Sequence, residues 1–346
     1  MKKKLFLSII VLTLVSTLAL FMLVGCNDND NGDETTTPVE VKVCVPDGSP
    51  AIAIAKLLQD NLTYDGYNIS YEIVTGSEGI GARLASGQAT IAIAPTNVGA
   101  TQYNKNNGKY KLAATAVQGA LYMVGKGEVV GDTVAEQLSS LKGKTVYNIG
   151  QGATPDLTFK YILDYYQIPY QATATESADY VSLQYVSAGS ELIPLLKQGK
   201  AQFGIMGEPA VTNANAKAGT TTLFSIQDLW NGVTNTTGGF PQASVLVQNT
   251  IADGNHDAFL GWFLTKLEES ANWTKTNAEA AKTALTAAGS TSLAGLNANM
   301  INKCNISIVR ANSAKASVNT YLTALHGFNP QTVGGSIPND AFYYAV

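Results

Sequence analysis

Two hydroxyl side chains, each followed by proline, stand at matching places in the two halves of the chain. Ser49-Pro50 and Thr154-Pro155 each come after an apolar run and before a helical pattern. Serine and threonine are favoured at the N-cap of a helix, and proline at the next position lacks an N–H that would have no intrahelical partner. Because the free N–H groups and the dipole of a helix start attract anions and polar acceptors, both places are candidates for ligand binding. The alternative is that each hydroxyl only caps its helix.

The segments that must position these hydroxyls alternate between strand and helix patterns. Predicted strands cover residues 39–46, 67–74, 90–94, 145–149, 183–186 and 201–206, and predicted helices cover 50–61, 77–86, 134–141, 155–166 and 191–198. Residues 258–289 are predicted to be helical with one break, and residues 305–325 to be mostly helical. This alternation predicts an α/β fold with mostly parallel sheets.

The order of elements repeats between the halves. In each half, a helix that begins near Pro50 or Pro155 is followed by a strand, a second helix, and a glycine turn at Gly87 or Gly199 that leads into another strand. The repeat predicts two lobes of similar topology. Ligands of open parallel sheets bind outside the carboxyl ends of the strands, and two such edges that face one another form a cleft that closes by hinge motion.

The N-terminal segment has the pattern of an export signal. Lysines occupy positions 2–4, an uncharged apolar run covers 5–24, and a polar run follows from 27 to 37. A secretory signal has this order of charge, apolar stretch and small residue. The run Leu23-Val24-Gly25-Cys26 resembles the bacterial lipobox, which implies that residues 1–25 are a lipoprotein signal peptide and that Cys26 is acylated. Residues 26–38 are then a flexible tether on the extracytoplasmic face of the cell membrane. The alternative is a plain transmembrane anchor.

Charge and cysteine content exclude several classes of protein. The chain has 22 basic and 26 acidic residues, and without the three N-terminal lysines the balance is 19 to 26, or about −7. A nucleic-acid-binding protein would need a basic face. Three cysteines and two histidines argue against a zinc or disulfide scaffold, so we predict no metal and no cofactor. Cys44 and Cys304 form either one disulfide or two buried free thiols.

Four segments together resemble the solute-binding proteins of ABC importers, and in particular the subgroup that binds sulfonates, nitrate and thiamine precursors. They are the lipobox, the strand that leads into Gly48-Ser49-Pro50, the strand and loop of 87–97, and residues 199–210 with the element Gly207-Glu208-Pro209-Ala210. The resemblance covers residues 39 to 248. It implies a monomer that binds a small-molecule solute and has an ABC transporter permease as its partner.

The same resemblance implies the type II periplasmic-binding fold. In this fold, each of two lobes has a mixed, mostly parallel sheet flanked by helices, and two crossover strands join the lobes. We place the crossovers at 119–126 and 239–247. Lobe one then covers residues 39–119 plus 246–346, and lobe two covers residues 120–245.

Candidate ligand contacts are polar or aromatic residues at the ends of the predicted strands, although each could instead be ordinary turn chemistry. In lobe one they are Ser49, Ser77, Glu78, Thr96 and Asn97, in lobe two they are Gln151, Gly152, Ala153, Thr154 and Glu208, and beside the first crossover they are Gln118 and Tyr122.

The composition also bears on the solute. The chain has only two arginines, Arg83 and Arg310, but 16 tyrosines. We therefore predict that no arginine side chain binds a carboxylate of the solute. Glu208 would suit an amine or a ring N–H. The solute that fits best is a heterocyclic vitamin or vitamin precursor, and the second choice is a small oxyanion such as a sulfonate.

Other classes of function are less well supported. The sequence has none of the Gly-x-Ser-x-Gly, His-Glu-x-x-His or phosphate-loop motifs, so we predict no catalytic residues and no enzyme. The alternatives are a ligand sensor, the binding subunit of a TRAP-type transporter, a fold-related enzyme and an adhesin.

Overall fold

The computed structural model describes residues 37–344, except the side chains of residues 76–78. From Pro38 onward the chain forms one compact unit. The predicted signal peptide, nearly all of the tether, and Cys26 lie outside the described residues, as do the side chains of Ser77 and Glu78.

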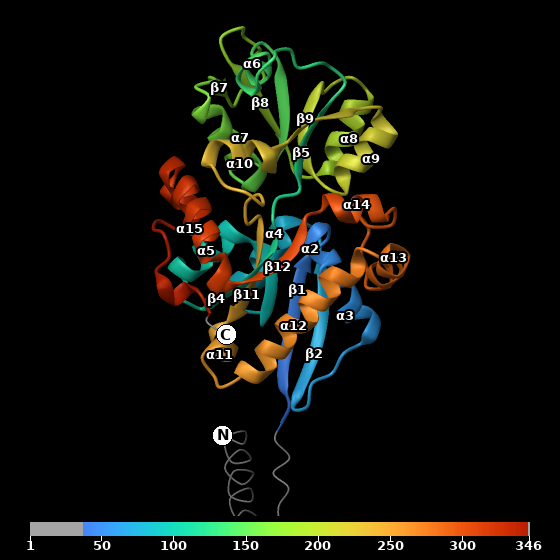
Figure 1. The fold of residues 1–346 in the computed structure, drawn as a ribbon, viewed down its shortest axis with the longest axis vertical. Coiled ribbons are helices and arrows are strands. Elements are labelled where there is room, and N and C mark those ends of the chain that lie inside the picture. The colour runs from blue at the N-terminus through green and yellow to red at the C-terminus, as the bar shows by residue number, and fades with distance from the viewer. Residues whose placement is uncertain (1–36, 345–346) are drawn as a thin grey trace, which may run out of the picture. The chain divides into compact units, whose positions relative to one another are not determined.

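Two six-stranded mixed sheets organise this unit (Figure 1). The first sheet has, in spatial order, β2 (Tyr67–Val74), β1 (Val39–Pro46), β3 (Ile91–Pro95), β11 (Ala243–Gln248), β4 (Tyr110–Val117) and β12 (Ile306–Arg310). The second has β7 (Tyr170–Gln171), β8 (Val181–Val186), β6 (Thr145–Ile149), β9 (Phe203–Gly207), β5 (Leu121–Gly125) and β10 (Thr221–Ser225). In the first sheet β2, β1 and β3 are parallel, as are β7, β8, β6 and β9 in the second, and the remaining strands pair antiparallel.

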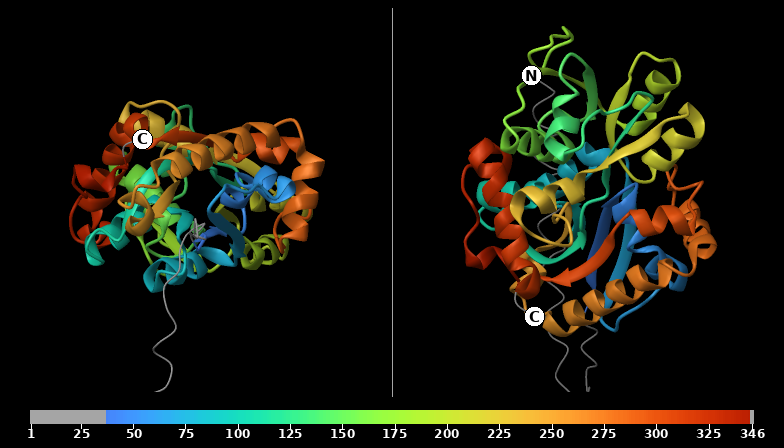
Figure 2. Two further views of the ribbon diagram at one scale, coloured as in Figure 1. Left: turned by 90° about the horizontal axis from the view of Figure 1, so that it is seen from below. Right: turned by 45° about the horizontal axis from the view of Figure 1, so that its top comes forward.

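Helices cover both faces of the first sheet, because its central strands bury both of their faces. Along β1, Val43 and Val45 face one core while Cys44 faces the other. One face carries α4 (Gly76–Ser86), α5 (Thr96–Lys105) and α15 (Ala311–Phe328), and the other carries α2 (Ser49–Ile52), α3 (Ala55–Asp60), α12 (Asp257–Thr274) and α13 (Ala278–Ala287). The short elements α11 (Asn249–Ala252), α14 (Ala298–Lys303), η1 (Pro330–Val333) and η2 (Asp340–Phe342) complete this part. Figure 2 shows α15 in red and α13 in orange on opposite sides of it.

The second sheet is covered in the same way. Val146 of β6 and Ile205 of β9 pack toward one set of helices, and Met206 packs toward the other. The first set is α6 (Val134–Ser139), α7 (Thr154–Tyr165) and α10 (Ile226–Thr234), and the second is α8 (Gly189–Lys197) and α9 (Ala210–Ala218).

The chain passes between the sheets twice. It leaves the first sheet after Val117 and enters the second at Leu121, and it returns between Thr234 and Ala243. We call the first sheet with its helices lobe one, and residues 121–234, which hold the second sheet and its helices, lobe two.

Two predicted helices differ from the structure. The helix predicted over 50–61 is two short helices, α2 and α3, because Ile54 leaves the helical conformation at ψ 5°. The helical segment predicted over 305–325 begins with β12, whose apolar residues pair with β4 before α15 starts. The predicted break within 258–289 is confirmed, since α12 ends at Thr274 and α13 starts at Ala278.

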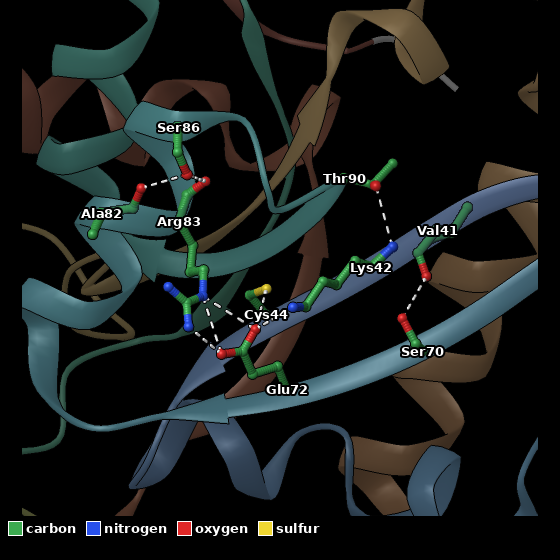
Figure 3. Close-up of polar contacts among 9 residues, drawn as sticks. All are labelled: Val41, Lys42, Cys44, Ser70, Glu72, Ala82, Arg83, Ser86 and Thr90. Carbon is green, nitrogen blue, oxygen red and sulfur yellow. Dashed lines mark hydrogen bonds and ion pairs between the residues drawn. The ribbon is translucent and has the colours of Figure 1, made fainter.

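The carboxylate of Glu72 is the centre of a charged cluster on lobe one (Figure 3). Arg83 of α4 donates to both of its oxygens, with Nε at 3.0 and 3.1 Å and Nη2 at 2.6 Å, and Nζ of Lys42 lies 2.6 Å from Oε2. These hydrogen bonds, first those of Arg83 and then that of Lys42, lower the pKa of Glu72 to about 2. Burial beside this carboxylate raises the pKa of the Cys44 thiol to about 11.

Replacing Glu72 with glutamine should make stability depend less on pH. The pKa of Glu72 falls from 4.5 to about 2 on folding, so the charged form stabilises the fold above pH 4.5 and this contribution is lost as the pH falls from there toward 2. At neutral pH we expect Glu72→Gln to lower the free energy of unfolding by about 1–2 kcal/mol, measured by urea titration.

The difference between wild type and Glu72→Gln should therefore shrink in acid. Asp65→Asn, on the exposed turn before β2, is the control and should change little. A difference that stays constant down to pH 2 would contradict the assignment.

Candidate functional site

The hydroxyls of Ser49 and Thr154 join one lobe to the other. Ser49 Oγ donates to the backbone oxygen of Glu208 at 2.9 Å, and Thr154 Oγ1 donates to Oδ1 of Asn97 at 3.3 Å. All four residues are buried. The sequence-based prediction that the two hydroxyls are N-caps is wrong, because the N-caps of α2 and α7 are Gly48 and Ala153 and neither helix has a side-chain cap. The hydroxyls are instead at the first helical position, free to reach across.

The start of α5 forms the matching part of lobe one. Thr96 and Asn97 follow directly after β3, and both are buried. The hydroxyls of Thr96 and Ser244 lie 2.7 Å apart, while Nδ2 of Asn97 donates to the backbone oxygen of Thr332 at 3.3 Å. These contacts fix Asn97 so that its oxygen faces Thr154.

Glu208 lies where β9 ends in lobe two. Its Oε1 accepts from the hydroxyl of Thr212 at 2.8 Å and its Oε2 from the backbone N–H of Thr212 at 3.1 Å. Burial raises the pKa of this carboxyl, and the hydrogen bonds from Thr212 oppose the rise. The carboxylate therefore holds the N-terminus of α9.

Tyr122 and Gln118 flank the first crossing. The hydroxyl of Tyr122 in β5 donates to the backbone oxygen of Lys303 in α14 at 3.0 Å, which is a further bond between the lobes. Burial raises its pKa to about 12. Nε2 of Gln118 donates to Thr115 Oγ1 at 2.7 Å and to the backbone oxygen of Ser307 at 3.0 Å, so this side chain is held within lobe one.

The loop before α7 holds the remaining candidates. Gly152 has a φ of 75°, in the left-handed region that favours glycine. Gln151 and Gly152 are exposed, and Ala153 is half-buried. The N–H of Gly152 donates to Oδ2 of Asp156 at 2.8 Å, so the loop is tied back to its own helix.

The structure adds two residues that the sequence did not single out. The hydroxyls of Thr158 in α7 and Tyr321 in α15 are fully buried, and neither has a hydrogen-bond partner among the described residues. Burial raises the pKa of Tyr321 to about 12, and the neighbouring hydroxyls of Thr154 and Thr158 oppose the rise. The position of Thr158, one turn after Thr154, was readable from the sequence, whereas Tyr321 comes from the far end of the chain with no local signal.

Neither arginine of the chain is free to bind a ligand carboxylate. Arg83 is paired with Glu72, and Arg310 is paired with Glu268, where Nε and Oε1 are 2.8 Å apart. Within residues 37–344, no three His, Cys, Asp or Glu side chains gather in a way that could hold a metal ion. Cys44 and Cys304 are both buried free thiols, so the alternative of a disulfide between them is wrong.

A surface groove of about 930 Å³ opens beside the contact between the lobes. It lies between α7 and α15 and is lined by residues that include Tyr161, Tyr165, Asn319 and Phe328. The predicted ligand residues do not line it, because the starts of α2, α5 and α7 and the end of β9 meet directly.

No protein-family model and no curated protein matches the chain, but solved structures do. An ABC transporter protein from Parabacteroides distasonis is 25% identical, with a TM-score of 0.72 over 89% of this chain and 98% of the other. The periplasmic aliphatic sulphonate binding protein SsuA from Escherichia coli is 16% identical, with a TM-score of 0.65 over 89% and 92%. The alkanesulfonate-binding protein SsuA from Xanthomonas axonopodis pv. citri, bound to MOPS, is 11% identical, with a TM-score of 0.57 over 87% and 95%.

These neighbours confirm the predicted fold class. The chain has the α/β fold of the periplasmic binding proteins, with two mixed sheets flanked by helices, and its structural neighbours include an ABC transporter protein and a periplasmic sulphonate binding protein.

Loss of one bond between the lobes should expose Cys304. This thiol is fully buried beside Ser49, and burial raises its pKa to about 12. Ser49→Ala removes the hydrogen bond to Glu208, so we expect Cys304 to be alkylated about fivefold faster in mildly alkaline buffer, as followed by mass spectrometry of the labelled peptides. Cys44, inside the first sheet, is the internal control. Equal acceleration at both thiols would indicate general unfolding instead.

Proposed function

We propose that the protein is an extracytoplasmic substrate-binding protein that captures a small solute between its lobes and delivers it to the permease of an ABC importer. The observation that carries the proposal is that two pairs of residues, Ser49 with Glu208 and Asn97 with Thr154, join the carboxyl ends of strands in the two sheets. In this class of fold, ligands bind at such strand ends. The structural neighbours include an ABC transporter protein, a periplasmic sulphonate binding protein and a ligand binding component of an ABC-type import system, which supports a binding role over an enzymatic one.

For the solute, we propose a heterocyclic vitamin or vitamin precursor, and a small oxyanion such as a sulfonate as the alternative. The side-chain hydrogen bonds of Ser49, Thr154 and Tyr122 between the lobes come from hydroxyl groups, and both arginines are paired with carboxylates elsewhere. The sulfonate alternative rests on the neighbours that bind alkanesulfonates.

Direct bonds between the lobes have an energetic consequence for capture. A solute that enters must replace the Ser49 and Thr154 hydrogen bonds with its own, so only a ligand that satisfies these hydroxyls gains net free energy. Capture of this kind favours a polar solute that can bridge both lobes. A ligand sensor or a TRAP-type binding subunit would use the same cleft. A gene for an ABC permease next to the gene of this protein would favour the importer over both alternatives.

A thermal-shift screen of the full chain in detergent tests the proposal. Vitamins, pyrimidines, sulfonates and amino acids form the panel. A true solute at 100 times its dissociation constant should add about 2.7 kcal/mol to the stability. No shift with any class of compound would contradict capture of a small solute.

The double variant Asn97→Ala with Thr154→Ala tests the location of the site with whichever compound binds. Binding should fall at least about tenfold in calorimetric titration because both lobes lose a polar contact, while the unfolding transition remains cooperative. Thr63→Ala with Asn68→Ala, two exposed positions at the amino end of β2, is the matched control. Equal affinity in both double variants would place the solute elsewhere.

We further propose that the protein is a monomer held on the membrane by a lipid on Cys26. In the described part of the chain, no helix is long and apolar enough to cross a bilayer. In a bacterial host, Cys26→Ser should remove the acyl mass and release the protein from the membrane fraction, while Cys304→Ser should not. Retention of the Cys26→Ser protein in the membrane would favour a transmembrane anchor.

A further inference from the structure

Three helices of lobe two begin at the edge that faces lobe one. They are α7, α8 and α9, which follow the parallel neighbours β6, β8 and β9, so their N-termini lie along one edge of the second sheet. Free N–H groups at such an edge are the usual place for an anion in folds of this type. The state of these N–H groups therefore bears directly on the charge of the solute.

Each of the three helix starts has a carboxylate of its own. Asp156 accepts from the N–H of Gly152 at 2.8 Å. Glu191 accepts from the N–H of Ser187 at 3.0 Å. For α9, Glu208 accepts the N–H of Thr212 at 3.1 Å. Thr212 lies in the first turn of α9, whereas Gly152 and Ser187 lie in the loops just before α7 and α8. The three carboxylates thus place negative charge along this edge, where it stabilises the helix ends and repels an oxyanion.

The positive groups packed near this edge do not reverse its charge. Lys160 is bound to Asp156, with Nζ and Oδ2 2.8 Å apart, and Asp156 also accepts from the hydroxyl of Tyr185 at 3.0 Å. Lys303 of lobe one faces Glu208, where its charge only partly offsets the effect of burial on the pKa of that carboxyl. The three carboxylates Asp156, Glu191 and Glu208 thus outnumber the two lysines, Lys160 and Lys303, and Lys160 is already paired with Asp156.

The hydroxyls beside Thr154 provide a second, independent observation. Thr158 Oγ1 and Tyr321 OH are fully buried without a hydrogen-bond partner among the described residues, at the contact between α7 and α15. A buried polar atom without a partner costs free energy, so a polar group that enters here is favoured. A hydroxyl both donates and accepts, so it suits an uncharged polar group without requiring an anion.

We infer that the solute is neutral or cationic, that it presents N–H or O–H donors to lobe two, and that sulfonates, phosphates and carboxylates are excluded. This inference rests on the proposed solute capture and narrows the choice of solute left open there. It also separates this chain from the neighbours that bind alkanesulfonates, whose fold it shares.

The first arm of the test measures charge selection in the wild-type full chain. MOPS, ethanesulfonate, inorganic phosphate and acetate are titrated beside the neutral and cationic members of the solute panel, at constant ionic strength. We expect binding only from neutral or cationic compounds, and no binding of the four anions at about 1 mM. An anion that binds with a dissociation constant below about 1 mM would overturn the inference but leave solute capture intact. If no compound of any charge binds, the proposed function itself fails.

The second arm tests the cause. Glu191→Gln and Glu208→Gln keep the shape of each side chain and remove the charge, and Glu191 is exposed, so its variant does not depend on repacking the core. Glu279→Gln removes the first-turn carboxylate of α13 in lobe one and is the matched control.

We expect the Glu191→Gln and Glu208→Gln double variant to bind ethanesulfonate at least about tenfold more tightly than wild type, with Glu191→Gln alone intermediate and Glu279→Gln unchanged. Circular dichroism checks that each variant is folded. No gain in either lobe-two variant would overturn the role of the carboxylates.

Discussion

Direct contact between helix starts of opposite lobes is the constraint on which the rest of the site depends. Parallel strands deliver each following helix to the same edge of a sheet, so Thr154 and Asn97, which begin α7 and α5, can meet with their oxygens 3.3 Å apart. Ser49 and the backbone of Glu208 meet in the same way. A few polar atoms at strand ends, beside the apolar packing of Trp230 against Tyr321, therefore join the two sheets. The proposed solute would compete for those polar atoms.

Much of this arrangement could be predicted from the sequence, because it rests on local patterns. The apolar strand patterns before Ser49, Thr154 and Glu208 placed these residues at strand ends, and the structure brings all three to the contact between the lobes. Where the prediction was wrong, tertiary contacts had overridden local preference. Both hydroxyls favour caps in isolation, yet each gains a buried partner in the other lobe instead.

Other features had no local signal at all. Tyr321 reaches the contact from α15, more than a hundred residues after Thr154 along the chain, and only the tertiary fold brings the two together. The carboxylates of Asp156 and Glu191 were visible as acidic residues in a first helical turn, but their meaning depends on three helices starting along one edge. In that arrangement, three carboxylates that each stabilise one helix together make this edge of the second sheet negatively charged.

The discontinuity of lobe one sets an order of assembly. Residues 121–234 contain every strand of the second sheet, so lobe two can complete its hydrogen bonding as soon as that stretch is free to fold. Lobe one cannot, because β11 sits between β3 and β4 and β12 borders β4, and both are made later. Until Ala243–Gln248 emerges, β3 and β4 have unpaired edges that can join other chains. Newly made chains are therefore most prone to aggregation in this interval, when lobe two has folded and lobe one still lacks β11.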